Sequence, residues 1–381
     1  MELIGYHDAL VRRGNVIHFG RAPTIRSPDG GVRIAVSFVG VCGTDLQILN
    51  GRRPDTAEIL GHEGVGTVIE SNRRGQLEEG TQVVFNPAAQ LSRGRILGHN
   101  TPGIFQKYIT LDSLAVDEGL VMPANVGDRP ICGALVEPLA AIIYAYELIS
   151  NRTPNLNRVA VFGGGPVGLL AATFLRGLGV NVLLVHPTQT RLETIASLKI
   201  LSSDEMAMVS DVKTRSDLPF DAALICTSRI GASPALRQAI EIVRDGACID
   251  LITNYPQGVG APFGIDASAL SRVRGENICG APRGGRYLDA HVLDRRISFT
   301  GHRGTSHTHL ERALRSLADN AVAYMKLMTH ILPLRIAGEA VQRLSETQSH
   351  LVQGRDCIKL IIDMTKAAQS AHHPLELSRH A

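Results

Sequence analysis

The side chains of this sequence that could bind a metal occur in three short motifs, the last of them far along the chain from the other two. Cys42 lies in the sequence GVCGTD and His62 and Glu63 lie in GHEGVG, while Glu137 lies in VEPLA. A thiolate and an imidazole suit Zn²⁺, a carboxylate can be the third ligand, and a catalytic zinc ion keeps a fourth position for water or substrate. Taken singly, a buried cysteine and a hydrogen-bonded histidine are the more ordinary interpretations. Together, these residues predict a scattered zinc site.

A glycine-rich turn predicts a second site, for a dinucleotide. The sequence GGGPVG follows an apolar strand expected at 158–162 and precedes a helix expected over 169–179. In this context the first glycine allows a tight turn, the second lets the backbone approach a pyrophosphate, and the third permits close helix–strand packing. The free N–H groups of the helix N-terminus then face the phosphates. The residues expected at the cofactor are Gly163, Gly165, Pro166, Val167 and Gly168.

The end of the next expected strand, at residues 181–185, bears on the choice between NAD and NADP. Folds that bind NAD usually have an Asp or Glu here, about 20 residues after the turn, which holds the ribose hydroxyls. This chain instead has His186, Thr188 and Arg191, and no acid that would repel a 2′-phosphate. The segment therefore favours NADP, with NAD as the alternative. Arg191 is equally compatible with an ordinary residue in the first turn of a helix.

The elements that must position these residues differ between the two parts of the chain. About the first 150 residues read as short strands broken by glycine and proline, for example at 32–41 and 64–71, and then as a helix over 134–150. From residue 158, strands alternate with helices, which is typical of a parallel sheet with helical crossovers. We therefore expect an α/β protein with a mainly-β part and a dinucleotide-binding part.

Composition and charge restrict the classes of protein to which the chain can belong. Of its 381 residues, 44% are hydrophobic and 20% are charged, and the formal net charge of +3 argues against nucleic acid as the main partner. No apolar run reaches the ~18 residues of a membrane helix, and the N-terminal residues lack the pattern of a signal peptide. The six cysteines are scattered without CxxC pairs, as in a reduced protein. We expect a cytoplasmic protein without a membrane partner.

Four motifs follow one another along the chain: Cys42-Gly-Thr-Asp, Gly61-His62-Glu63-Gly-Val-Gly, Glu137-Pro-Leu and the later GGGPVG. Their order resembles that of the zinc-dependent medium-chain dehydrogenases/reductases, above all the sorbitol, glucose and threonine dehydrogenase branches. The similarity extends from about residue 30 to residue 363. It implies a GroES-like, mainly-β catalytic domain at residues 1–153 and 307–381. It also implies a Rossmann domain, with a doubly wound parallel sheet, at residues 154–306.

The resemblance implies a role for each residue of the predicted zinc site. Glu63 is implied to lie beside the metal, where it can exchange with a water molecule or another ligand. Asp45 matches the acid that orients the ligating histidine, and Thr44 matches the hydroxyl that passes the substrate proton outward. Gln47 stands where many relatives have a histidine at the end of that relay. The implied zinc ligands are Cys42, His62 and Glu137, and the further implied cofactor contacts are Thr227, Thr300 and Gly301.

Two departures from the family pattern carry further expectations. Many relatives have a structural zinc lobe with four cysteines, but the corresponding residues 86–108 contain none, so we expect one zinc ion per chain. His99, in this polar loop, is expected to be solvated rather than a ligand. The segment 254–296 is longer than one crossover connection and rich in Gly and Arg. It is either a lid that brings Arg283 or Arg286 near an anion, or an exposed basic insertion involved in oligomer contacts.

Together, the residues and the resemblance predict an oxidoreductase that transfers a hydride between NAD(P) and a secondary alcohol. The expected substrate is a small polyhydroxylated molecule, such as a polyol, sugar or cyclitol, with or without a phosphate. Arg52 and Arg53 are either contacts for an anionic group of the substrate or ordinary surface charges. We expect a homodimer or homotetramer. The alternatives are a zinc-free quinone or enone reductase of the same superfamily, and a regulatory NADPH-binding protein without turnover.

Overall fold

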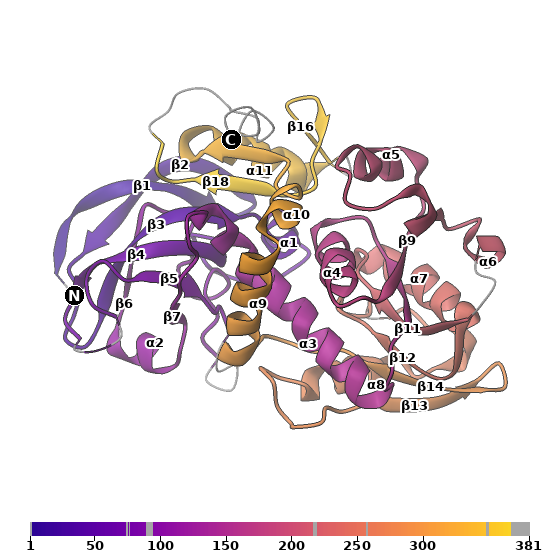
Figure 1. Cartoon of the computed structure of the whole chain (residues 1–381). Coiled ribbons are helices and arrows are strands. Elements are labelled where there is room, and N and C mark those ends of the chain that lie inside the picture. Colours follow the sequence, from indigo (N-terminus) through magenta and orange to yellow (C-terminus); the bar gives the residue numbers. More distant parts are fainter. Residues whose placement is uncertain are drawn as a thin grey trace. The chain divides into compact units, whose positions relative to one another are not determined.

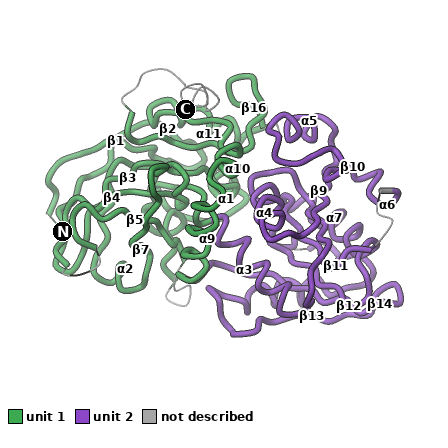
Figure 2. Tube along the Cα trace, in the orientation of Figure 1, with its two compact units in different colours: residues 1–137, 306–381 green, residues 138–305 purple. Residues whose placement is uncertain are grey.

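The computed structural model describes residues 2–73, 75, 77–88, 94–215, 219–256, 258–347 and 350–366 (Figure 1). The chain divides into two compact units, Met1–Glu137 with Ser306–Ala381, and Pro138–Thr305 (Figure 2). The boundary expected at residue 153 lies at the C-terminal end of helix α3 (Val136–Arg152), whereas the observed division falls in the first turn of this helix. The second division, between residues 305 and 306, lies one residue before the expected one.

The first unit is built on a seven-stranded sheet with the order β15-β18-β3-β4-β5-β7, in which β6 pairs with β3. Alternate side chains of β3 are buried, as expected for strands with one face on a core. The hairpin of β1 and β2 has strands of 11 and 10 residues, longer than the short strands expected in this part. The strands are β1 (Leu3–Arg13), β2 (Val16–Ile25), β3 (Val32–Gly40), β4 (Glu63–Ser71), β5 (Gln82–Phe85), β6 (Tyr108–Leu111), β7 (Val121–Pro123), β15 (His330–Pro333), β16 (Leu351–Val352), β17 (Arg355–Asp356) and β18 (Leu360–Asp363).

The helices of the first unit are short, apart from two amphipathic ones near the C-terminal end. In α11, Leu334, Ala337 and Val341 recur at helical spacing and pack into the core of this unit. The helices are α1 (Gly43–Leu49), α2 (Ser113–Asp117), the 3₁₀ helix η2 (Pro130–Leu135), α9 (His307–Asp319), α10 (Ala321–Met325) and α11 (Leu334–Glu346).

The second unit is a doubly wound sheet with the order β10-β9-β8-β11-β12-β14-β13, and this confirms the expected fold class. All neighbouring strands run parallel except β13, which is antiparallel to β14. The chain leaves β8 toward one edge of the sheet and returns to β11 on its other side, so β8 and β11 flank the switch point where such sheets bind ligands. The strands are β8 (Arg158–Phe162), β9 (Asn181–His186), β10 (Met206–Met208), β11 (Phe220–Ile225), β12 (Val243–Asp250), β13 (Leu288–Val292) and β14 (Arg295–Thr300).

The helices of the second unit include the crossovers of this sheet. They are α3 (Val136–Arg152), α4 (Pro166–Gly177), α5 (Gln189–Ser197), the 3₁₀ helix η3 (Ser203–Glu205), α6 (Val212–Arg215), α7 (Arg229–Ile242), the 3₁₀ helix η4 (Pro262–Gly264) and α8 (Ala267–Glu276).

Together η2 and α3 form a run of 23 residues that is long and apolar enough to cross a membrane. Because 72% of its apolar window is buried, it has the character of a core helix in a soluble protein.

The structure explains the length of the segment 254–296. It contains the crossover helix α8 and the extra antiparallel strand β13, so it is longer than a single crossover. Asn277 fastens the segment, because its side-chain amide donates to the carbonyl oxygens of Arg286 and Gly301 at 3.0 and 2.9 Å. The Arg283 and Arg286 residues are exposed. The structure thus accounts for the length of the segment and leaves both functional interpretations as predictions.

Candidate functional site

The first candidate site is assembled by the antiparallel pairing of β3 with β4. Gly40, at the end of β3, pairs with Glu63, at the start of β4. The chain therefore enters the turn before α1 beside the loop that carries His62. Cys42 caps the N-terminus of α1, with the Asp45 carboxylate accepting from the Cys42 amide at 2.9 Å. The other Asp45 oxygen accepts from the Gly61 amide at 3.1 Å, so Asp45 joins the two loops.

Three potential metal ligands converge at this junction. One ligand atom each from Cys42, His62 and Glu63 lies within 4.8 Å of the others. His62 and Glu63 are 4% and 3% exposed, and the buried Nδ1 atom of His62 has no hydrogen-bond partner among the described residues. A thiolate, an imidazole and a carboxylate form a donor set that suits zinc. The residues present therefore fit a zinc ion.

Asp45 and Glu137 lie close to this group. Asp45 Oδ1 is 3.7 Å from His62 Nδ1, which is longer than a hydrogen bond, and its oxygens accept backbone amides instead. Burial raises the pKa of Glu137 to about 7, although the nearby His62 acts in the opposite direction. Glu137 is not part of the 4.8 Å group in the described part of the chain, whereas Glu63 is, and the role of Glu137 as a zinc ligand stays a prediction.

A buried lysine that the sequence reading missed completes the first site. Lys359, which precedes β18, is 2% exposed and donates hydrogen bonds to the Glu63 carboxylate and, at 3.0 Å, to the Val41 carbonyl oxygen. Gly40 leaves room for this pair, because a Cβ atom there would lie 2.8 Å from both the Glu63 carboxylate and the Lys359 side chain. The available signal was a charged residue inside the apolar sequence CIKLII.

The charges of the pocket favour a bound cation. Burial, reinforced by the Glu63 carboxylate, raises the pKa of the Cys42 thiol. Burial alone would lower the pKa of His62, but Cys42 and Asp45 outweigh it and hold this pKa well above its usual value. Among the described residues, Lys359 forms an ion pair with Glu63, which is one of the three residues of the 4.8 Å group. A divalent ion would offset the remaining negative charge and favour the thiolate.

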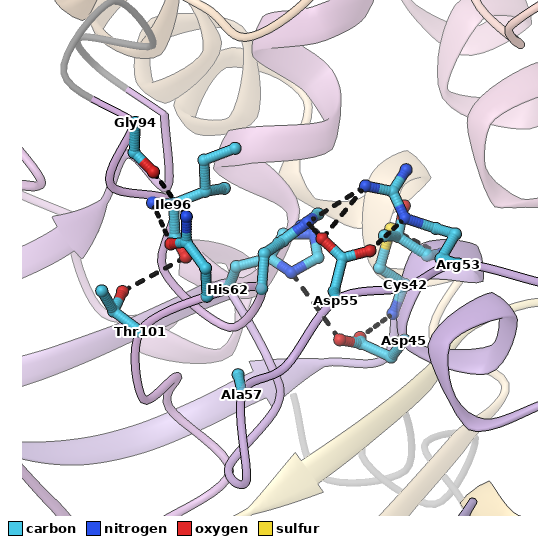
Figure 3. A network of polar contacts seen from close by, with 12 residues as sticks. Cys42, Asp45, Arg53, Asp55, Ala57, His62, Gly94, Ile96 and Thr101 are labelled. Atoms are coloured by element: carbon cyan, nitrogen blue, oxygen red, sulfur yellow. Dashed lines mark hydrogen bonds and ion pairs between the residues drawn. The ribbon is translucent and has the colours of Figure 1, made fainter. Parts of the chain in front are cut away.

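A second layer of polar side chains lies against His62 (Figure 3). The His99 and His62 rings are 5.2 Å apart between centroids, and Nδ1 of His99 is 3.0 Å from Asp55 Oδ1. The Arg53 guanidinium donates to the same carboxylate from Nε at 2.7 Å. The expectation that His99 is solvated was wrong, because its side chain is only 12% exposed and is held by Asp55. Burial and the nearby His62 lower the pKa of His99 to about 4, so it is neutral near pH 7.

The glycine-rich turn lies between β8 and α4, as predicted. Gly163 has φ of 120°, and a Cβ atom on Gly168 would lie 1.9 Å from the Gly163 carbonyl oxygen. The third glycine of the motif is therefore required for close packing of helix and strand. At Gly165, by contrast, a Cβ atom would meet nothing within 4 Å, so space is open where a phosphate would approach. Pro166 and Val167 begin α4, whose first N–H groups face this space.

The residues expected near the ribose are also brought to this turn. A Cβ atom on Gly164 would lie 3.1 Å from the Arg191 side chain and 3.2 Å from the His186 ring, so both side chains flank the turn. The Thr188 amide donates to Nδ1 of His186 at 3.2 Å. Arg191 is 7% exposed, which shows that its stem packs on the turn rather than extending into solvent.

The three other expected cofactor residues lie at the ends of β11 and β14. Gly163 adjoins Thr227, because a Cβ atom on Gly163 would lie 3.2 Å from the Thr227 amide. The Thr300 hydroxyl is buried and donates to the Arg286 carbonyl oxygen at 3.0 Å, so it is already engaged by the protein. Gly301 follows β14, and a Cβ atom there would lie 2.8 Å from the Leu251 carbonyl oxygen.

The chain is similar to known proteins in sequence and in fold. Residues 28–118 match the alcohol dehydrogenase GroES-like domain family. A 2-dehydro-3-deoxy-L-galactonate 5-dehydrogenase from Pseudoalteromonas atlantica is 30% identical over 195 residues, which are 46% of this chain and 55% of that protein. A sorbitol dehydrogenase from Halalkalibacterium halodurans is 28% identical over 323 residues, which are 78% of this chain and 84% of that protein. A solved structure from Sinorhizobium meliloti, bound to NADP, is similar in fold, with a TM-score of 0.70 at 17% identity over 94% of this chain and 99% of that chain.

Proposed function

We propose that the chain is a zinc-type medium-chain dehydrogenase that interconverts a secondary alcohol and a ketone on a polyol or sugar-like molecule. One observation carries the proposal, namely the convergence of Cys42 and the buried His62 and Glu63 within 4.8 Å of one another. The named substrates of the two relatives, sorbitol and a sugar acid, support the substrate class. The reaction converts the alcohol and the oxidised cofactor into a carbonyl compound, the reduced cofactor and a proton.

The proposed chemistry divides between the bound groups and the side chains of this chain. When bound, zinc would polarise the alcohol oxygen as a Lewis acid, and the nicotinamide would accept the hydride. Cys42 and His62 would hold the ion, with Glu63 or Glu137 as the carboxylate ligand. Thr44, in the first turn of α1, would take the proton that leaves the alcohol. Lys359 keeps the Glu63 carboxylate in place.

We propose NADP as the preferred cofactor, with NAD as the alternative. His186 and Arg191 flank the glycine-rich turn, and Arg191 supplies a cation near the expected ribose position. No acid stands at the end of β9 to repel a 2′-phosphate. The proposal extends to one zinc ion per chain, a cytoplasmic location, and a homodimer or homotetramer that needs neither nucleic acid nor a membrane.

Metal analysis and a substrate panel test this function. The purified chain should contain one zinc ion and should oxidise polyols or sugar acids with NADP⁺ or NAD⁺. Cys42→Ser should abolish turnover and metal binding while nucleotide affinity persists, because the nucleotide residues lie in the other unit. Cys132→Ser is the matched control, since Cys132 is also buried in the first unit but lies outside the 4.8 Å group. Full activity in Cys42→Ser would contradict the proposal and favour a zinc-free reductase. Nucleotide binding without turnover of any substrate would favour a regulatory protein.

A further inference from the structure

The Arg53 guanidinium lies one imidazole ring away from the metal ligands, and the proposed reaction does not use it. Its Nη2 atom is 3.3 Å from Nδ1 of His99, whose ring is 5.2 Å from that of His62. Asp55 accepts from Arg53 Nε and Nη2 at 2.7 and 3.3 Å. Figure 3 shows the Arg53 and Asp55 side chains directed toward one another beside His62. A positive charge is thus fixed near the reaction site.

The contacts of Arg53 leave one edge of its guanidinium available. An ionised Asp55 is only an acceptor, so the 3.0 Å contact requires Nδ1 of His99 to carry the proton and to donate to Asp55. Arg53 Nη2 therefore has no acceptor at His99, and Arg53 Nη1 makes no hydrogen bond to any residue that the structure describes. The side chain is 29% exposed, so Arg53 is only partly covered by the protein.

The loop that carries Arg53 is held in place before any substrate arrives. Arg12, from β1, donates from Nη1 to the carbonyl oxygens of Asp55 and Ala57 at 2.8 and 3.0 Å. The Ala57 amide donates to the His99 carbonyl oxygen at 2.7 Å. A guanidinium that is already oriented loses little conformational entropy when it binds an anion. The arrangement is therefore that of a preorganised binding group rather than of a loose surface charge.

We propose that Arg53 is a specificity-determining residue that binds the terminal carboxylate of a sugar-acid substrate. The inference rests on the proposed function and names the substrate class of the same site. A planar carboxylate matches the free edge of a guanidinium in a bidentate manner. A carboxylate fits better than a phosphate dianion, because Arg53 already offsets the charge of Asp55.

Two matched substrate pairs test the inference on the zinc-loaded full chain. Galactonate is compared with galactitol, and gluconate with sorbitol, because each pair differs at the terminal group. We expect kcat/KM of the wild type to be at least tenfold higher for the acids. Arg53→Gln should lower the acid-to-polyol ratio at least tenfold, mainly through KM for the acid, and Arg53→Lys should restore part of it. Arg52→Gln is the control, since Arg52 is exposed and makes no side-chain contact among the described residues, and its ratio should match the wild type.

A second measurement does not depend on turnover. Calorimetric titration of the zinc-loaded chain with gluconate, without nucleotide, should give at least tenfold weaker binding in Arg53→Gln than in the wild type. Thermal unfolding of each variant separates a lost contact from a lost fold. An unchanged acid-to-polyol ratio and unchanged gluconate affinity in a folded Arg53→Gln would overturn the inference, as would a wild type that prefers sorbitol or sorbitol 6-phosphate. In both cases the proposed function would stand, whereas it would fall if no polyol or acid were oxidised.

Discussion

Replacement of Asp250 by Asn should stabilise the second unit at alkaline pH. Asp250 ends β12, is 0% exposed, and neither of its carboxylate oxygens has a hydrogen-bond partner among the described residues. Burial raises its pKa from 3.8 to about 7, although Arg274 acts in the opposite direction. Asp250 also acts on the pKa values of four other groups, and burial raises all four, so these groups stay neutral at neutral pH: Cys226, Cys248, Tyr144 and Tyr287.

The sign and size of the effect follow from proton linkage. Because the folded-state pKa is the higher one, the folded chain binds more protons between pH 4 and 7. The contribution of Asp250 to stability is therefore fully present below about pH 4 and is lost as the pH rises through 7. The whole shift corresponds to about 4 kcal/mol, of which roughly 2–3 kcal/mol falls between pH 5 and pH 8. This pH-dependent part does not include any change in packing caused by the amide.

Thermal unfolding of the wild type and Asp250→Asn between pH 5 and pH 8.5 measures this difference. The Tm of the variant minus the Tm of the wild type should increase by roughly 5–10 °C over this pH range for a unit of this size. Asp289→Asn is the control, because Asp289 pairs with Arg152 and its pKa is lowered, so it is ionised throughout this range. Parallel pH profiles for wild type and Asp250→Asn would refute the reasoning, since they would mean that the carboxylate is not destabilised by burial.

Three further predictions follow from single contacts. Lys359→Met should lower the free energy of unfolding of the metal-free chain by about 3–5 kcal/mol, because the Glu63 carboxylate is left buried without its partner. Urea unfolding measures this loss, and a value below about 1 kcal/mol would contradict the prediction. The double variant with Glu63→Gln should recover part of the lost stability. Gly168→Ala should weaken nucleotide binding at least tenfold with zinc content unchanged, because its Cβ would meet a backbone oxygen at 1.9 Å. The control is Gly177→Ala, where a Cβ meets nothing within 4 Å. Equal nucleotide affinities of Gly168→Ala and the wild type in fluorescence titrations would contradict the prediction. His186→Asp should shift the ratio of kcat/KM values from NADP⁺ toward NAD⁺ at least tenfold, because a carboxylate there repels a 2′-phosphate, and an unchanged ratio would disprove the role of this strand end.

Local spacing was enough to predict the parts of the protein that depend on neighbouring residues. The fold class was confirmed, because a strand, a glycine-rich turn and a helix in succession leave few alternative structures. Residues 28–118 match the GroES-like domain family that the motifs had implied. The position of the turn between β8 and α4 was predicted for the same reason. Cys42 and His62 could be identified as candidate ligands from the chemistry of their side chains and the motifs around them.

The tertiary structure decided which partner each of these residues meets. Glu63, rather than Glu137, lies within the 4.8 Å group, because the pairing of Gly40 with Glu63 sets which side chains reach the end of β3. Lys359 joins Glu63 from 296 positions away along the chain. His99 was expected in solvent, yet it contacts Asp55. Side chains on a strand alternate between two faces, and sheet register and loop packing determine what lies opposite them. These contacts join distant parts of the chain, and no pattern of neighbouring residues encodes them directly.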